Sequence, residues 1–346
     1  MISKKLMVAS AALSIMSASS VAHASTADHF QDRTITIVIP YGPGGTYDKY
    51  GSSFSNHIGK FIPGKPTVIL QHMPGAGGAK AMGYMYKVAP KVGFHMFVPL
   101  DNIVVNQLMR PKKMRYKAQD FNYLGSSNQT NIVVVARSDT GAVSIDAWKK
   151  GGVALIGATS GKSSSGYIAP RLTMGLLGLK GRIVTGYKGS SRSILAIEQG
   201  EAQMAAFNWL AWASKVPHWF KGEKPFARAI LQLGAFKDPA LPNVPMLNDL
   251  VPQSQKALVS FLGSAGPIGR GLAFPPGVDK DTVAVVRTAY NKMNADKKFE
   301  AELKKRKLRL MPSTGQQIQS IIEKTIKESS PEVIAKVKKI VFGGGS

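Results

Sequence analysis

Apolar and polar positions along the 346-residue chain follow two periods, one typical of strands and one typical of helices. Short runs rich in β-branched or other apolar residues predict buried strands. These runs occupy residues 35–39, 67–71, 94–100, 123–125, 131–136, 153–156, 182–185 and 203–207. Helical spacing predicts helices over residues 82–86, 101–108, 144–148, 167–177, 194–198, 279–294, 299–307, 314–327 and 331–341. Strands that alternate with helices predict an α/β fold with parallel strands.

The junction at residues 35–48 carries the most information. Its strand ends at Pro40, which has no N–H to donate, and the glycine-rich residues 42–45 then permit a tight, exposed turn. Thr46 or Asp48 can cap the helix that follows, whose pattern continues through Ile58. Free N–H groups and the positive end of a helix dipole would meet at this turn. The pattern therefore indicates an anion receptor, with an ordinary strand-to-helix turn as the alternative.

The same strand–loop–helix device recurs along the chain. The strand at 67–71 leads into His72-Met-Pro-Gly-Ala-Gly-Gly78, and the strand at 153–156 leads into residues 157–166, where hydroxyls replace prolines. The strands at 182–185 and 203–207 end in Gly186-Tyr-Lys-Gly-Ser190 and in Asn208-Trp209. Open α/β sheets bind ligands at such strand ends, so these loops are expected to share a site.

An ordered set of motifs resembles the Bug family, the periplasmic solute receptors of tripartite tricarboxylate transporters. The matching segments are Val38-Ile-Pro-Tyr-Gly-Pro-Gly-Gly-Thr-Tyr-Asp48, Met73-Pro-Gly-Ala-Gly-Gly78, Val88-Ala-Pro-Lys-Val-Gly93, Gly186-Tyr-Lys-Gly-Ser190, Gly200-Glu-Ala-Gln203, Leu241-Pro-Asn-Val-Pro245 and Ala273-Phe-Pro-Pro-Gly277. The resemblance implies an α/β, two-domain periplasmic-binding-protein type II fold with a ligand cleft between the domains. It places domain 1 at residues 25–124 and 258–346 and domain 2 at residues 125–257.

The resemblance implies a function of capture and delivery. A small carboxylate, either a di- or tricarboxylate or an aromatic acid, would be held between the lobes and handed to the membrane permease subunits of the transporter. Its candidate contacts are Tyr41, Gly44, Gly45, Thr46, Asp48, Gly77, Gly78, Ser126, Asn128, Thr159, Ser160, Ser163, Tyr187, Lys188, Gly189, Ser190 and Asn208. Lys188 could neutralise a carboxylate and Tyr187 could form a wall. Asp48 could contact ligand or cap its helix, and the cap is the favoured interpretation.

The N-terminus has the three parts of a secretory signal peptide. Lys4 and Lys5 form a basic start, residues 6–21 are small and apolar, and Ala22-His-Ala24 is a cleavage site, which assigns residues 1–24 to the signal. The chain has no cysteine, which excludes disulfides, thiol chemistry and a lipid anchor at the cleavage point. A free periplasmic monomer is expected. Its net charge of +25 favours anionic ligands, although a solvated basic surface accounts for most of it.

Other chemistry is poorly supported by the residues. Gly157-Ala-Thr-Ser-Gly-Lys-Ser163 is one residue short of a phosphate-binding P-loop. The serine-rich loop lacks the G-x-S-x-G spacing of a hydrolase, and no His or acidic cluster has metal-ligand spacing. The basic clusters lack the interleaved aromatics of a nucleic-acid module. We therefore expect neither an enzyme nor a cofactor. A periplasmic sensor that feeds a two-component system and, less favoured, a secreted hydrolase remain alternatives.

Overall fold

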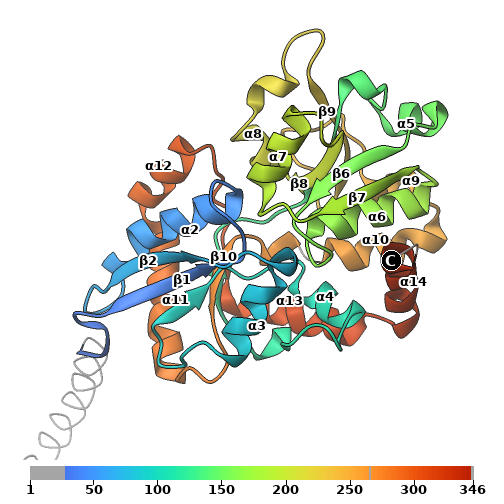
Figure 1. The fold of residues 1–346 in the computed structure, drawn as a ribbon. Helices are drawn as coiled ribbons and strands as arrows, with labels where there is room; N and C mark the ends of the chain where they lie inside the picture. Colours follow the sequence, from blue (N-terminus) through green and yellow to red (C-terminus); the bar gives the residue numbers. More distant parts are fainter. Residues whose placement is uncertain (1–27, 265, 344–346) are drawn as a thin grey trace, which may run out of the picture.

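The computed structural model describes residues 28–264 and 266–343, which form two lobes, each built around one β-sheet (Figure 1). The first lobe contains a six-stranded sheet with the order β11-β4-β10-β3-β1-β2, and the second contains a five-stranded sheet with the order β7-β6-β8-β5-β9. The predicted signal peptide and its cleavage site lie outside the described residues.

In the first lobe, three parallel strands carry the two predicted glycine loops. They are β1 (Thr34–Ile39), β2 (Thr67–His72) and β3 (His95–Phe97), and β1 lies between the other two. Strands β4 (Asn122–Ser126), β10 (Gly271–Phe274) and β11 (Ser313–Thr314) complete the sheet. Strand β10, which comes late in the chain, lies between β3 and β4 and runs antiparallel to both.

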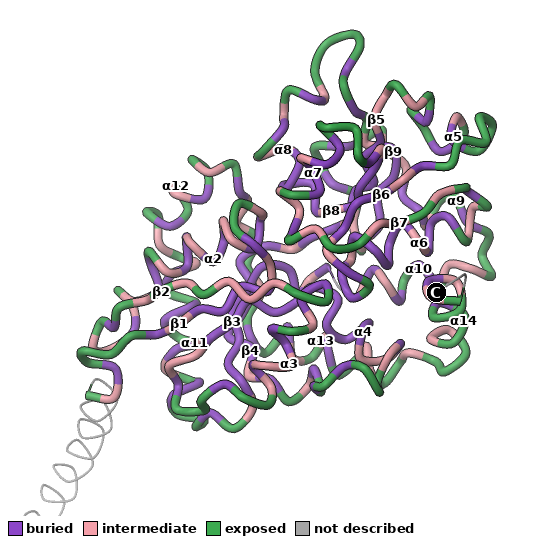
Figure 2. The backbone as a smooth tube through the Cα atoms, viewed as in Figure 1, coloured by how far each residue is buried: buried purple, intermediate pink, exposed green. Residues whose placement is uncertain are grey.

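The helices of the first lobe cover this sheet with apolar faces. They are α2 (Thr46–His57), α3 (Ala79–Lys87), α4 (Ile103–Met109), α11 (Lys280–Ala295), α12 (Lys297–Lys305) and α13 (Gly315–Glu328). Ile37 on β1, Phe54 on α2 and Tyr290 on α11 are fully buried members of one core. Strands β1, β3 and β4 are largely buried, whereas the edge strand β2 alternates between exposed and half-buried residues (Figure 2).

The second lobe repeats this plan. Its strands are β5 (Ile132–Arg137), β6 (Leu155–Thr159), β7 (Gly181–Thr185), β8 (Met204–Asn208) and β9 (Ala227–Leu233). Its helices are α5 (Ile145–Gly151), α6 (Ser165–Leu177), α7 (Ser190–Glu198), α8 (Trp209–Ala213), α9 (Leu247–Leu250) and α10 (Lys256–Gly263). Strand β6 pairs in parallel with β7 and β8, whereas β5 runs antiparallel to β8 and β9. Parallel strands that end at the same edge bring their loops together there.

Short 3-10 helices complete the secondary structure. They are η1 (Ile58–Lys60), η2 (Ala76–Gly78), η3 (Ala118–Asp120), η4 (Ser138–Thr140), η5 (Pro217–Phe220), η6 (Gln253–Gln255) and η7 (Gly266–Ile268). Among the described residues, no helix combines the length and the apolar character needed to cross a bilayer.

The chain crosses between the lobes twice, between β4 and β5 and again between α10 and β10. Its last helix, α14 (Pro331–Phe342), then packs on both sides of this boundary, against α4 of the first lobe and α6 and α10 of the second (Figure 1). Val337 and Val341 of α14 are fully buried in this cluster. The predicted domain boundaries remain a prediction, since α14 contacts helices of both lobes.

The α/β fold class is confirmed, and most predicted strands and helices lie where the pattern placed them. Three strands, β9, β10 and β11, were missed. Residues 262–276 read as loop because glycine and proline flank the short run Gly271-Leu-Ala-Phe274, yet that run is β10, and all four of its residues are buried. Strands β9 and β11 and helices α8, α9 and α10 likewise had no predicted counterpart.

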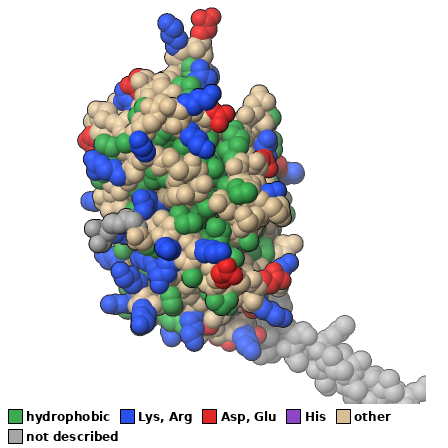
Figure 3. Space-filling model, turned by 90° about the vertical axis from the view of Figure 1, so that its right-hand side faces the viewer, with side chains coloured by type: hydrophobic (Ala, Val, Ile, Leu, Met, Phe, Trp, Pro, Cys, Tyr) green, Lys and Arg blue, Asp and Glu red, His purple; other side chains and the backbone are tan. Residues whose placement is uncertain are grey.

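Lys and Arg side chains are scattered over the face shown in Figure 3, with fewer Asp and Glu side chains among them and large hydrophobic and uncharged areas between. Individual positions agree with this view, since the side chains of Lys297 and Lys336 are 91% and 60% exposed. A large part of the positive charge is therefore solvated.

Candidate ligand-binding cleft

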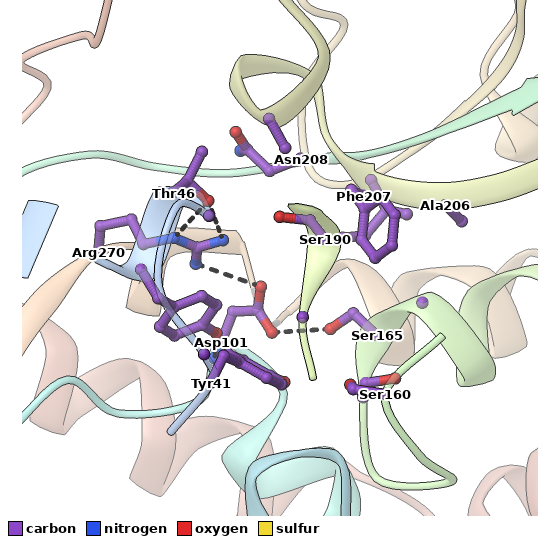
Figure 4. A pocket seen from close by; sticks show the side chains of 18 residues that line it. Tyr41, Thr46, Asp101, Ser160, Ser165, Ser190, Ala206, Phe207, Asn208 and Arg270 are labelled. Carbon is purple, nitrogen blue, oxygen red and sulfur yellow. Dashed lines mark hydrogen bonds and ion pairs between the residues drawn. The ribbon is translucent and has the colours of Figure 1, made fainter. Parts of the chain in front are cut away.

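A cavity lies between the lobes, where strands of both sheets end and helices begin. It is lined from the first lobe by Tyr41, Gly42, Gly45, Thr46, Tyr47, Asp101 and Arg270, and from the second by Ile132, Ser160, Ser164, Ser165, Gly166, Gly189, Ser190, Ala206, Phe207, Asn208 and Ala211. Figure 4 shows these side chains facing one another across the gap between the lobes.

Three long helices start at this cavity. Helix α2 begins after Gly45, α6 begins after Ser164, and α7 begins after Gly189, and all three of these capping residues line it. The N–H groups of a helix's first turn have no partner within the helix, and the helix dipole adds positive potential at the same end. The cavity therefore favours an anion without any cationic side chain.

A cationic side chain is nevertheless present. Arg270, which precedes β10, is 3% exposed, and its guanidinium lies 3.7 Å from the centre of the Tyr47 ring. Its Nε and Nη2 donate to Thr46 Oγ1 at 3.3 and 3.2 Å, and its Nη1 donates to the main-chain oxygen of Gly269 at 3.0 Å (Figure 4). These contacts hold the guanidinium flat beside the N-terminus of α2.

Asp101 is the acidic partner of Arg270. It follows β3, is 5% exposed, and its Oδ2 lies 3.4 Å from Arg270 Nη1. Its Oδ1 accepts a hydrogen bond of 2.7 Å from Ser165 at the start of α6, which belongs to the other lobe (Figure 4). Asp101 therefore joins a buried ion pair of the first lobe to a helix N-terminus of the second.

Two tyrosines complete the wall on the first lobe. The Tyr41 and Tyr47 rings meet edge to face at 4.7 Å, and burial, followed by the charge of Asp101, raises the pKa of Tyr47 well above its ordinary value. Burial also raises the pKa of Tyr41, whose hydroxyl donates to the main-chain oxygen of Gly77 at 3.1 Å. Both phenols are therefore neutral at physiological pH. The Tyr47 hydroxyl accepts the N–H of Asp101 at 3.1 Å and bonds to the Asp101 carboxylate.

Contacts around the cavity hold the two lobes together. The N–H of Gly42 donates to the main-chain oxygen of Lys188 at 2.6 Å. On the other side, the amides of Asn102 and Asn106 donate to the main-chain oxygen of Ser163 at 2.9 and 2.7 Å. The cavity is therefore bordered by polar bonds between the lobes, as expected of a closed cleft.

A family profile for the tripartite tricarboxylate transporter family receptor, TctC, matches residues 62–338. The chain belongs to this family. A Cupriavidus necator protein described as the UPF0065 protein in the gbd 5' region is 25% identical over 87% of each chain. The resemblance to the Bug family is thereby confirmed.

Several solved structures share the fold of this TctC-family receptor. The periplasmic binding protein BugD has a TM-score of 0.71 and 16% identity and covers 90% of this chain and 98% of its own. MatC from Rhodopseudomonas palustris, with bound malate, has a TM-score of 0.68 and 18% identity and covers 89% and 99%. Rpa4515 from R. palustris, with adipate, has a TM-score of 0.68 and 19% identity and covers 88% and 97%. The predicted two-lobed binding-protein fold is therefore confirmed, and the family is one of binding proteins rather than enzymes.

The receptor's structure brings part of the predicted site together. The predicted residues that line the cavity are Tyr41, Gly45, Thr46, Ser160, Gly189, Ser190 and Asn208. They come from both glycine-rich and hydroxyl-rich loops, so the recurring strand–loop–helix device does converge on one place.

The other predicted residues lie around the cavity rather than on it. Gly77 packs against the main chain of Ser163 and Gly161 across the cleft, and Gly78 packs on Leu100. Thr159 shares a hydrogen bond of 2.8 Å with Ser164, and Ser126 donates to the main-chain oxygen of Asn128 in the first crossing between the lobes. These residues shape or join the lobes.

The two second-lobe side chains with the most explicit predicted roles also point elsewhere. The hydroxyl of Tyr187 donates to Glu201 at 3.1 Å near the surface. Lys188 is exposed and lines an outer groove together with Arg192 and Lys215, while its main-chain oxygen accepts the N–H of Gly42 in the first lobe.

Asp48 holds the first glycine loop from within. Its Oδ2 accepts the N–H of Gly44 at 2.8 Å, and its Oδ1 lies 2.6 Å from Nε2 of His72. Neither Asp48 nor Gly44 lines the cavity, and the N-cap residue of α2 is Gly45, which makes no side-chain cap. The Asp48 carboxylate therefore accepts the N–H of Gly44, one residue before the N-cap Gly45. This agrees better with the predicted capping role than with a contact to ligand.

Arg270 and Asp101 were missed by the sequence reasoning, although each left a signal. Asp101 directly follows the apolar run 94–100, at a strand end. Arg270 is a single charge between two glycines in an otherwise uncharged stretch, residues 257–278. Among the described residues, no group of three or more His, Asp or Glu side chains could hold a metal ion.

Proposed function

We propose that this receptor captures a small carboxylate in the cleft and delivers it to the membrane permease subunits of a tripartite tricarboxylate transporter. The observation that carries the proposal is the convergence of three helix N-termini and buried Arg270 on one cavity. Malate and adipate, the ligands of two structural relatives, are both carboxylates, which agrees with this chemistry.

The ligand carboxylate lies at the N-terminus of α2, beside the main chain of Gly45 and Thr46 and the guanidinium of Arg270. Each hydrogen bond to such a charged group contributes about 1.5–3 kcal/mol. The opposite wall offers the hydroxyls of Ser160 and Ser190. A ligand held in this way contacts both lobes at once.

Contact with both lobes makes binding favour the closed cleft. A ligand shifts an equilibrium only by its difference in affinity for the two states, and Ser160 and Ser190 reach it only when the lobes are close. Closure also forms the bonds of Gly42 with Lys188 and of Asn106 with Ser163. The permease would recognise the closed surface, and the receptor would act as a monomer in the periplasm, where members of its family reside.

The test is thermal unfolding of the protein without its signal peptide, residues 25–346, after removal of copurified ligand. The panel contains mono-, di- and tricarboxylates and aromatic acids, each paired with its uncharged amide. A true ligand at a hundred times its Kd stabilises the protein by about 2.7 kcal/mol, an easily measured shift of Tm. We expect at least one acid to raise Tm while its amide does not. A panel without any response, or equal responses to acid and amide, would refute carboxylate capture.

A further inference from the structure

We infer that the captured carboxylate carries an amino or hydroxyl group on the neighbouring carbon, and that Asp101 accepts the hydrogen bond of this group. The inference rests on the proposed function, because it concerns the ligand of the same cleft. It follows from the positions of Arg270 and Asp101 in the cavity wall.

The cavity presents a cation and an anion side by side. Arg270 and Asp101 both line it, both are at least 95% buried, and their nearest charged atoms are 3.4 Å apart. A 2-amino or 2-hydroxy acid has the complementary arrangement, since its carboxylate and its donor group sit on adjacent carbon atoms. One end can face Arg270 while the other faces Asp101.

The hydrogen-bond count of the pair leaves room for such a ligand. A guanidinium has five N–H donors, and Arg270 uses four of them, two toward Thr46, one toward Gly269 and one toward Asp101. The remaining donor is on Nη2. A carboxylate accepts about four hydrogen bonds, and Asp101 accepts one from Ser165, a long one from Arg270 and one from the Tyr47 hydroxyl, which leaves one acceptor position open. A ligand N–H or O–H beside Asp101 can occupy that open position, and a hydrogen bond to a buried carboxylate is favourable.

An acid without an amino or hydroxyl group on its second carbon fits the cavity less well. Its carboxylate can use Arg270 and the N-terminus of α2, but it brings a negative charge close to Asp101 and supplies no donor to it. The ligand carboxylate and the Asp101 carboxylate carry like charges, and like charges held close together in a buried site repel strongly. Asp101 therefore discriminates between acids that differ only at the second carbon.

The ligand chemistry can be tested with two matched sets on constant carbon skeletons. One set is succinate, malate and aspartate, and the other is propionate, lactate and alanine; each affinity is measured by isothermal titration calorimetry on the ligand-stripped protein. We expect the substituted acids of at least one set to bind at least tenfold more tightly than the unsubstituted acid. This comparison uses the natural protein and needs no variant.

The D101N variant separates the two donor groups. Its amide keeps an acceptor oxygen but loses the charge, so we expect at least a tenfold loss for the amino acid and less than a threefold loss for the hydroxy acid. D139N is the matched control, because Asp139 also pairs with an arginine, Arg137, but lies on the surface at the opposite end of β5 from the cavity. D139N should bind every acid as the natural protein does.

The outcomes distinguish the two proposals. If succinate and propionate bind as tightly as their substituted counterparts, the inference about Asp101 is overturned while carboxylate capture stands. If D101N keeps the full preference for the amino acid, the assignment of that preference to Asp101 is overturned. If no acid of the wider panel binds, the proposed function itself fails.

Discussion

Replacing Arg270 with methionine should destabilise the protein strongly, because it leaves the buried carboxylate of Asp101 without its cation. At their separation of 3.4 Å, two unit charges attract by about 5 kcal/mol if the effective dielectric constant is about 20. Removing one partner of a buried pair costs about 3–5 kcal/mol, which agrees with this estimate. The variant also loses the contact with the Tyr47 ring at 3.7 Å and two hydrogen bonds to Thr46.

We expect Tm of R270M to fall by roughly 5–10 °C, since 1 kcal/mol shifts Tm by about 2 °C in a chain of this size. The double variant R270M/D101N should recover at least half of that loss, because no charge then remains buried and unpaired. R228M is the control, since Arg228 is exposed on β9 and its replacement should leave Tm within about 1 °C. Differential scanning calorimetry of the four proteins measures the effect. A double variant that melts as low as R270M would refute the charge-pair reasoning.

Three further variants test single contacts. The Cβ of G42A would lie 2.9 Å from the main-chain oxygen of Lys188, so the variant should resist closure and bind its acid roughly tenfold more weakly, or about 1.4 kcal/mol, by calorimetry. D48A should lose about 1–2 kcal/mol of stability in thermal unfolding, because the first glycine loop loses its acceptor, but should keep its affinity within threefold. Burial raises the pKa of Glu302, but hydrogen bonds from Ser53 and His57 outweigh it, so the pKa is lowered overall. The stabilisation by Glu302 is therefore present above pH 4.5 and is lost as the pH falls further. E302Q should lower Tm at pH 7 by the equivalent of about 1 kcal/mol and flatten the decline of Tm below about pH 4.5.

Two of these variants, G42A and E302Q, have a matched control elsewhere. G83A adds a methyl on α3, where its nearest neighbour would be 3.8 Å away, and should leave affinity unchanged. E300Q removes an exposed carboxylate from the same helix as Glu302 and should not alter the acid limb of the Tm profile. Equal affinity losses in G42A and G83A would contradict the closure contact. A loss of affinity without a loss of stability in D48A would show that Asp48 binds the ligand.

The sequence could predict the fold because its signals are local. Proline and glycine at the end of an apolar run stop a strand and open a turn wherever they occur, so the loops after β1, β2 and β6 were readable. The convergence of these loops followed from parallel pairing, which puts strand ends at one edge. Strand β10 was not readable, because its burial between β3 and β4 comes from strands more than 140 residues away in the chain.

The side chains of the site depended on information that no local pattern holds. Arg270 and Asp101 are 169 positions apart, and only the antiparallel insertion of β10 beside β3 brings them together. Lys188 shows the converse case. It belongs to a motif at a strand end, yet its side chain lines the outer groove rather than the cavity, and its carbonyl oxygen accepts the N–H of Gly42.

The charges of the surface and of the cavity have different consequences for ligand recognition. The surface is strongly basic, so it attracts every small anion and speeds association in a way that salt weakens. The cavity instead pairs its one lining cation, Arg270, with Asp101 and therefore carries no net side-chain charge. Its preference for an anion comes from the N-termini of α2, α6 and α7, whose positions are fixed by the sheets. Surface charge thus affects how fast acids arrive, whereas the choice among them depends on Arg270, Asp101 and these three helix ends.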